Sequence, residues 1–291
     1  MPDVTPAAKP LLPAMRWWFL LDSFLVFVTG IQLFLLTEFT DRFFAWTIAP
    51  PLTAAFLGAS YWAAFPLVFL AARETLWARA RIAVYGVLAF TTLTNIATFL
   101  HLDRFHLTSP QPLALGATWA WLIVYVVVPP TILILIWRQQ QAPGGDPSRA
   151  APLPIWVRGI LVAQSALLIL AGIALFVAPH LAPTVWPWPL TPLTSRAVGA
   201  WLIGIGLIAG QAAWENDWTR LRGMTLGYIL LGVLHLLAAL RYGATVQWDS
   251  PTAWLYVLIL VSFLVVGGYG WLVGVRATNR ITRPSQGGAG H

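Results

Sequence analysis

Asp22 is the only acidic residue inside an apolar stretch long enough to cross a membrane. An unpaired charge at the middle of a bilayer costs at least about 2.5–3.5 kcal/mol, so such residues usually face a bundle interior or a water-filled cavity. Two interpretations follow. The carboxylate either bonds to a neighbouring helix or to Arg16, or it forms a proton or cation site in a cavity that opens to the cytoplasm.

A second group of polar side chains lies in the opposite half of the apolar stretches, around Asn95 and His235. Hydroxyl, amide and imidazole groups commonly hydrogen-bond across membrane helices, so helix packing is one interpretation. A polar pocket or pathway is the other. The candidate residues of a ligand or ion pathway are Asp22, Gln164, Asn95 and His235.

The most specific local pattern is E-x-x-W-x-R-x-R, which occurs twice. Its copies are Glu74, Trp77, Arg79, Arg81 and Glu215, Trp218, Arg220, Arg222. In each copy a carboxylate closes one helix, an indole lies at the membrane interface, and two arginines are placed to contact lipid phosphates or the glutamate of the other copy. One interpretation is a turn that fixes the topology, although an exposed ion pair contributes under about 1 kcal/mol. The other is a site for an anionic ligand or partner, built from both loops.

The motif belongs to a longer internal duplication. Residues 51–110 align without a gap on residues 192–251, with identical residues at 16 of the 60 positions. Pro51 and Pro192 stand at equivalent places, and proline favours the first position of a helix. Upstream of these segments an offset of 142 pairs Asp22 with Gln164 as its neutral counterpart. Such a repeat predicts one structural unit that occurs twice.

Membrane-spanning helices are predicted to carry these residues. The 291 residues are 58% hydrophobic and 9% charged, with a mean hydropathy of +0.74. Runs of about 20 apolar residues match the hydrocarbon thickness, and helices satisfy their own backbone groups there. We predict an all-α polytopic membrane protein with eight transmembrane helices as two parallel four-helix repeats. The predicted spans are 17–37, 52–72, 82–101, 115–137, 155–178, 195–214, 223–241 and 252–275.

Domain organisation and orientation follow from these spans. The predicted parts are an N-terminal tail (1–16), a first repeat (17–138), a linker (139–154), a second repeat (155–276) and a disordered tail (277–291). Thirteen of the 17 Lys and Arg residues fall on one side of the membrane. Because positive residues accumulate in cytoplasmic loops, both termini are expected in the cytoplasm, with the protein in a bacterial inner membrane.

Several kinds of chemistry are excluded by the residues present. The sequence has no cysteine, which excludes disulfides, thiolate metal sites and thiol redox chemistry. Haem with two axial imidazoles needs histidines on facing helices, and only His235 lies well inside a span; a retinal Schiff base needs a lysine in a span, and Lys9 is in the tail. His101, Asp103 and His106 have a spacing that suits a metal, but exposed histidine-rich loops are common. We expect no metal site and no cofactor.

The expected function is that of a non-enzymatic membrane protein which binds or transports a small or lipophilic molecule between its two repeats. The alternative is a non-catalytic scaffold or an assembly subunit of a larger membrane complex. The expected partners are the lipid bilayer, a small-molecule or lipid ligand, and other membrane proteins. The net charge of +7 forms no basic stripe along the sequence, so we expect no nucleic-acid partner.

Overall fold

Eight helical segments in the computed structural model of the chain are long and apolar enough to cross a membrane. The structure describes residues 7–282, with side chains as far as Gly274. The eight segments are Pro13–Leu35, Pro51–Arg73, Trp77–Leu100, Pro112–Gln141, Ile155–Val177, Pro192–Glu215, Arg222–Arg241 and Pro251–Gly274. Each overlaps one predicted span, so the prediction of an all-α membrane protein with eight transmembrane helices is confirmed.

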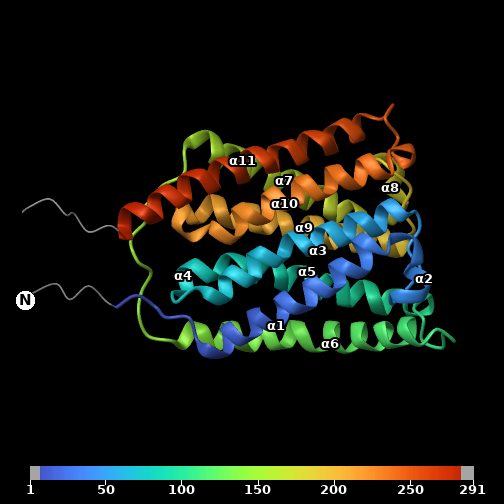
Figure 1. Cartoon of the computed structure of the whole chain (residues 1–291), viewed down its shortest axis with the longest axis horizontal. Helices are drawn as coiled ribbons and strands as arrows, with labels where there is room; N and C mark the ends of the chain where they lie inside the picture. The colour runs from blue at the N-terminus through green and yellow to red at the C-terminus, as the bar shows by residue number, and fades with distance from the viewer. Residues whose placement is uncertain (1–6, 283–291) are drawn as a thin grey trace, which may run out of the picture.

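The helices of Figure 1 have the following bounds. They are α1 (Pro13–Gly30), α2 (Thr40–Phe43), α3 (Pro51–Arg73), α4 (Trp77–Ala80), α5 (Val84–Leu100), α6 (Pro112–Gln141), α7 (Ile155–Val177), α8 (Ala182–Val185), α9 (Pro192–Glu215), α10 (Arg222–Arg241) and α11 (Pro251–Thr282). A π-helical turn (Ile31–Leu35) extends α1, and a 3-10 turn (Arg81–Ala83) joins α4 to α5.

Proline marks the first turn of five long helices: α1, α3, α6, α9 and α11. Its fixed φ suits the first helical position, where the missing N–H has no partner to lose. The first span therefore begins at Pro13, earlier than the predicted residue 17. At the other end of the chain α11 continues to Thr282. Residues 283–291 of the tail that we predict to be disordered lie outside the described residues.

Helix contacts follow the same pattern in both halves of the chain. α1 packs on α3 as α7 packs on α9, and α5 packs on α6 as α10 packs on α11. Between the halves, α3 packs on α10 and α5 packs on α9. Figure 1 shows the first half (blue to green) below the second (yellow to red), with α6 and α11 at the two outer edges. The most buried spans, α3, α9, α10 and α5, therefore form the centre between the halves.

Two glycines set the close approach of the halves. A Cβ atom on Gly86 of α5 would lie 2.7 Å from the carbonyl oxygen of Gly204 on α9. A Cβ atom on Gly227 of α10 would lie 2.9 Å from the carbonyl oxygen of Ala63 on α3. The repeat offset of 141 pairs Gly86 with Gly227 and Ala63 with Gly204. Small residues at both crossings let the helix backbones touch, as is common in membrane bundles.

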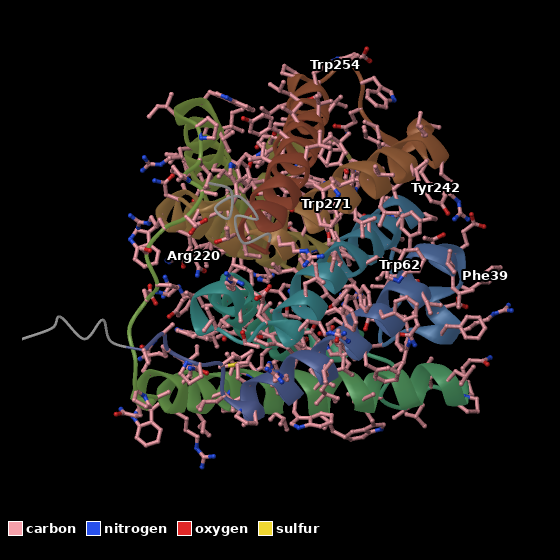
Figure 2. All side chains as sticks on the ribbon, turned by 60° about the vertical axis from the view of Figure 1, so that its left-hand side comes forward. Phe39, Trp62, Arg220, Tyr242, Trp254 and Trp271 are labelled. Carbon is pink, nitrogen blue, oxygen red and sulfur yellow. The ribbon has the colours of Figure 1, made fainter. Side chains whose placement is uncertain are left out.

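The two ends of the bundle differ in charge. The end at which α1 starts carries Arg73, Arg79, Arg149 and Arg220, and we call it the Arg-rich end. In Figure 2, Arg220 lies beside the segment that connects the halves, while Phe39 and Tyr242 lie at the opposite end. The charged motif and the loops around α2 and α8 thus lie at opposite ends of the bundle.

Candidate functional site

Asp22 lies on α1 with its side chain turned into the bundle. The residue is 8% exposed, and its carboxylate has no hydrogen-bond or ion-pair partner among the residues that the structure describes. Arg16, which the sequence offered as a partner, instead donates from Nη2 to the carbonyl oxygen of Glu74 at 3.1 Å. The carboxylate is therefore buried without a compensating donor, which is costly for a charged group.

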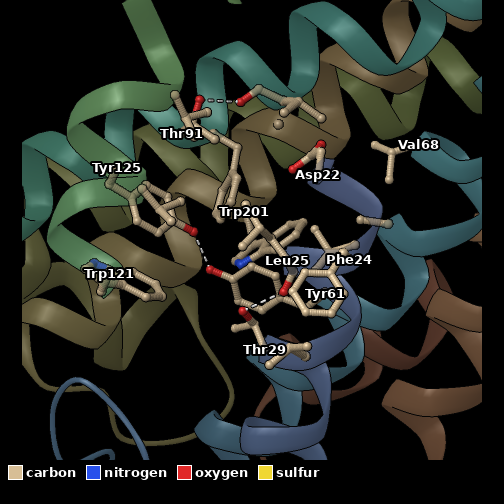
Figure 3. Close-up of a pocket in the computed structure, with 18 of the residues that line it drawn as sticks. Asp22, Phe24, Leu25, Thr29, Tyr61, Val68, Thr91, Trp121, Tyr125 and Trp201 are labelled. Carbon is tan, nitrogen blue, oxygen red and sulfur yellow. Dashed lines mark hydrogen bonds between the residues drawn. The ribbon is translucent and has the colours of Figure 1, made fainter. Parts of the chain in front are cut away.

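A cavity of about 200 Å³ lies beside Asp22, between α1, α3, α5, α6 and α9. Its wall is mostly apolar and rich in aromatic rings. Figure 3 shows Asp22 on one side of the cavity and Tyr61, Tyr125 and Trp201 on the other, from three different helices. Of the lining residues, all of them described, Asp22 is the only one with a charged side chain. We call this space the Asp22 cavity.

Two tyrosine hydroxyls form a second polar group at the wall of the Asp22 cavity. Tyr61 of α3 and Tyr125 of α6 share a hydrogen bond of 2.5 Å. One hydroxyl donates to the other, and the hydrogen of the accepting hydroxyl has no further acceptor among the described residues. The pair was not among the residues predicted from the sequence. A tyrosine in the middle of an apolar span is nevertheless a usable signal, because its buried O–H usually finds a partner.

The other candidate pathway residues lie away from the Asp22 cavity. Gln164 of α7 donates from Nε2 to Ser262 Oγ of α11 at 2.8 Å, and its Oε1 has no partner among the described atoms. Asn95 is half-buried on α5, and its Oδ1 is likewise without a described partner. The structure brings neither of them to the cavity wall, so the four candidates do not form one site.

His235 is a buried contact between the halves. Its Nδ1–H donates to the carbonyl oxygen of Leu231 at 2.7 Å, one turn back on α10. Its Nε2 lies 3.2 Å from both Ser60 Oγ and the carbonyl oxygen of Phe56 on α3. These contacts supply the imidazole of His235 with hydrogen-bond partners inside the packed centre. His235 therefore has the helix-packing role that was one of the two interpretations of the polar side chains around Asn95 and His235.

The second copy of the repeated motif forms a buried ion network. Glu215, at the end of α9, is fully buried. Arg81 of the first copy donates from Nε to its Oε1 and from Nη2 to its Oε2, the latter at 2.8 Å. Arg220 donates to the same Oε2 at 2.8 Å. Asp146 from the connecting segment lies 2.6 Å from Arg81 Nη2. The sequence predicted that the motif arginines contact either lipid phosphates or the glutamate of the other copy. Arg81 contacts the glutamate of the other copy.

The first copy of the motif is more open. Glu74 lies 4.0 Å from Arg79, and both side chains are partly exposed. Burial raises the pKa of the Glu74 carboxyl above its ordinary value, while the charges of Arg79 and Arg222 act in the opposite direction. Arg222 itself is exposed and stacks over Trp271, 5.8 Å from the ring centre. Equivalent sequence positions thus have different environments in the two halves.

The segments that precede each half dock on the motif loops in the same way. Trp77 N–H donates to Lys9 O at 3.1 Å, and Trp218 N–H donates to Ala151 O at 2.8 Å. Lys9 and Ala151 differ by 142, the offset that also pairs α1 with α7. In the second half Asp217 adds a clamp, because its carboxylate accepts from the backbone N–H groups of Ala150 and Ala151. Part of the predicted linker 139–154 is therefore held against the bundle.

A second cavity lies at the Arg-rich end, between the two halves. It has a volume of about 540 Å³ and is bordered by Lys9, Arg81, Gln211 and Trp214. The guanidinium of Arg81 is already satisfied by Glu215 and Asp146, and Lys9 Nζ donates to Gln140 O at 3.0 Å. The charges beside this cavity are engaged within the protein, in contrast to the free carboxylate of Asp22.

The loop histidines at the opposite end have protein partners. His101 Nε2 accepts from Arg196 Nη1 at 2.7 Å, a contact between the two halves. Burial and the positive charge of Arg196 lower the pKa of His101 below its ordinary value of 6.5. His106 donates from Nδ1 to Phe44 O at 2.9 Å. Within residues 7–282 no group of three metal-ligating side chains comes together.

Comparisons with known proteins do not assign a family. No protein-family model matches the chain, and neither the curated proteins nor the solved structures include a significant match. The eight apolar helices identify an integral membrane protein. What it does beyond that has to be inferred from its own cavities and charges.

Proposed function

We propose that this membrane protein binds a small, largely apolar molecule in the Asp22 cavity. The observation that carries the proposal is the buried Asp22 carboxylate, which borders a cavity of about 200 Å³ and has no partner among the described residues. Ligand pockets are typically concave and apolar, with a few polar groups that orient the ligand. A bound molecule with a hydrogen-bond donor would supply what Asp22 lacks.

Binding or transport is favoured over a pure scaffold for the same reason. A bundle that only packs against other membrane proteins gains nothing from an unpaired charged carboxylate, whose burial costs several kcal/mol in an apolar interior.

We also propose that the two halves are copies of one four-helix unit and that the Arg-rich end is cytoplasmic. The matched helix contacts and the charge bias support these two points. We propose no catalytic step, because only one carboxyl group borders the cavity.

A cavity-filling variant tests the proposal. Val87 lines the Asp22 cavity, whereas Val126 on α6 is 46% exposed and does not line it. The wild type, Val87→Phe and Val126→Phe are purified in mild detergent and their bound small molecules are identified by native mass spectrometry. We expect a ligand in the wild type and in Val126→Phe that is lost in Val87→Phe. Equal ligand content in all three folded proteins, or none in the wild type, contradicts the proposal.

A further inference from the structure

The chemistry of the Asp22 carboxylate restricts the ligand, provided that the proposed binding function holds. A buried carboxyl group without a nearby cation favours its protonated form, and a ligand cation would stabilise the ionised form, which only accepts hydrogen bonds. Among the described residues, no lysine, arginine or histidine lines the cavity. These residues therefore supply no cation to Asp22. A hydrogen bond to an ionised group is stronger than a neutral one, and a charged donor adds a direct charge–charge attraction that is large in an apolar interior. A ligand ammonium group would therefore satisfy Asp22 better than a hydroxyl group.

The aromatic wall suits the same group. Tyr61 and Trp201 meet edge to face with ring centres 4.9 Å apart, and Phe90 lies 4.0 Å from the ring of Trp201. These rings line the cavity together with Asp22. The faces of aromatic rings attract cations, and aromatic-lined pockets commonly bind alkylammonium groups. An anionic ligand would meet the carboxylate with like charge and would find no compensating cation.

The cavity reaches the lipid-facing surface between α1 and α6. Phe24 of α1 lines it and is 64% exposed at the bundle surface. Ala120 of α6 also lines it and is exposed. α1 and α6 touch at few positions, because α1 starts beside α6 at the lower left of Figure 1 and runs diagonally away from it. Since the surface there is apolar and lies within two membrane-spanning segments, the opening faces lipid and not water.

We propose that the ligand is a compact lipophilic amine that enters from the bilayer between α1 and α6 and places its ammonium group on Asp22. An apolar protein cavity of about 150 Å³ is known to hold benzene. The cavity of about 200 Å³ here therefore suits a somewhat larger molecule, such as an aryl-ethylamine. A longer tail would extend through the opening into the lipid.

Three matched probes test the charge of the ligand. These are 2-phenylethylamine, 2-phenylethanol and phenylacetate, which share the aromatic ring and differ in the polar group. Binding is measured by calorimetry for the wild type, Asp22→Asn and the control Asp249→Asn, which removes an exposed acid. We expect the wild type and Asp249→Asn to prefer the amine. Asp22→Asn should weaken amine binding by about ten- to a hundredfold, as for loss of a hydrogen bond to a charged group, and leave the alcohol almost unchanged.

Entry from lipid is tested with a second pair of variants in proteoliposomes. Ala120→Phe narrows the opening, whereas Ile123→Phe adds bulk to a lipid-facing position of α6 that does not line the cavity. Amine association is followed by stopped-flow fluorescence of the tryptophans. We expect several-fold slower association in Ala120→Phe and an unchanged rate in Ile123→Phe. Equal rates in the two variants overturn the proposed route.

The outcomes separate this inference from the proposed function. If the alcohol binds the wild type as tightly as the amine and Asp22→Asn changes neither, the cavity binds ligands but the amine assignment is wrong. If none of the three probes binds the wild type, the inference fails, and the co-purified ligand in the Val87→Phe experiment still decides the proposed function. If Asp22→Asn does not fold, the preference of the wild type for the amine over the alcohol remains decisive.

Discussion

Arg81 and Glu215 join the two halves of the chain through a two-point ion pair. Arg81 belongs to the first copy of the repeated motif and Glu215 to the second, and Glu215 is fully buried. Two parallel N–H to oxygen contacts fix the planar groups against each other. Asp146 and Arg220 complete the network. The motif therefore connects the halves at the Arg-rich end.

Replacing Glu215 with Gln should destabilise the protein strongly. The change leaves Arg81 and Arg220 buried with less negative charge between them, and removal of one partner from a buried ion pair typically costs about 3–5 kcal/mol. The matched control is Glu74→Gln at the same motif position, where the partly exposed pair with Arg79 should contribute under about 1 kcal/mol. The free energy of unfolding is measured by SDS titration in mixed micelles. Similar losses in both variants would contradict a special role of the Arg81–Glu215 pair.

Acidification should weaken the contact between His101 and Arg196. The pKa of His101 is lowered in the folded state by burial and by Arg196, and less by Arg104, while Asp103 opposes this. Between this lowered pKa and the ordinary value near 6.5, the unfolded chain binds more protons than the folded one. The stability that neutral His101 contributes is therefore present above that ordinary value and is lost as the pH falls below it.

The measurement is the unfolding midpoint at about pH 7.5 and about pH 5.5. His101→Gln, which keeps an acceptor for Arg196, should lose less stability on acidification than the wild type. His180→Gln, a change of an exposed histidine at the same end, should behave like the wild type. An identical pH response in all three proteins would refute a role of His101.

The proposed orientation predicts which loops react with reagents outside the cell. Because the sequence contains no cysteine, one introduced cysteine is the only thiol. Thr108→Cys and Ser148→Cys place it at exposed positions on the opposite end and on the connecting segment at the Arg-rich end. A membrane-impermeant maleimide should label Thr108→Cys in intact cells and Ser148→Cys only after lysis. The reverse pattern would place the Arg-rich end outside.

Local signals in the sequence were sufficient for the helices. Long apolar runs can satisfy their backbone groups in lipid only within the segment itself, so eight spans could be placed without knowing their neighbours. Pro51 and Pro192 begin α3 and α9 as expected. Asp22 also stood out, because a carboxylate inside an apolar run is recognisable from its immediate surroundings.

The contacts of the candidate residues depended on helices from other parts of the chain, which the sequence does not identify. Asp22 borders a cavity, whereas Gln164, its repeat counterpart, is bonded to Ser262. Tyr61 and Tyr125 meet although they belong to different helices. The segment 139–154 was predicted only as a linker, and the structure adds that Asp217 and Trp218 hold Ala150 and Ala151 in place. A repeat alignment treats each of these positions as equivalent to its copy.

The sequence by itself determined which segments are apolar enough to cross the membrane, where several of them begin and that one of them carries an acidic residue. These properties depend on residues that are close together in the chain. Only the tertiary structure decided that Glu215 is enclosed by two arginines while Glu74 remains partly exposed, and that Asp22 is left without a partner beside a cavity. The physical reason is that burial and pairing are set by helices from distant parts of the chain, and the two halves enclose their equivalent residues differently.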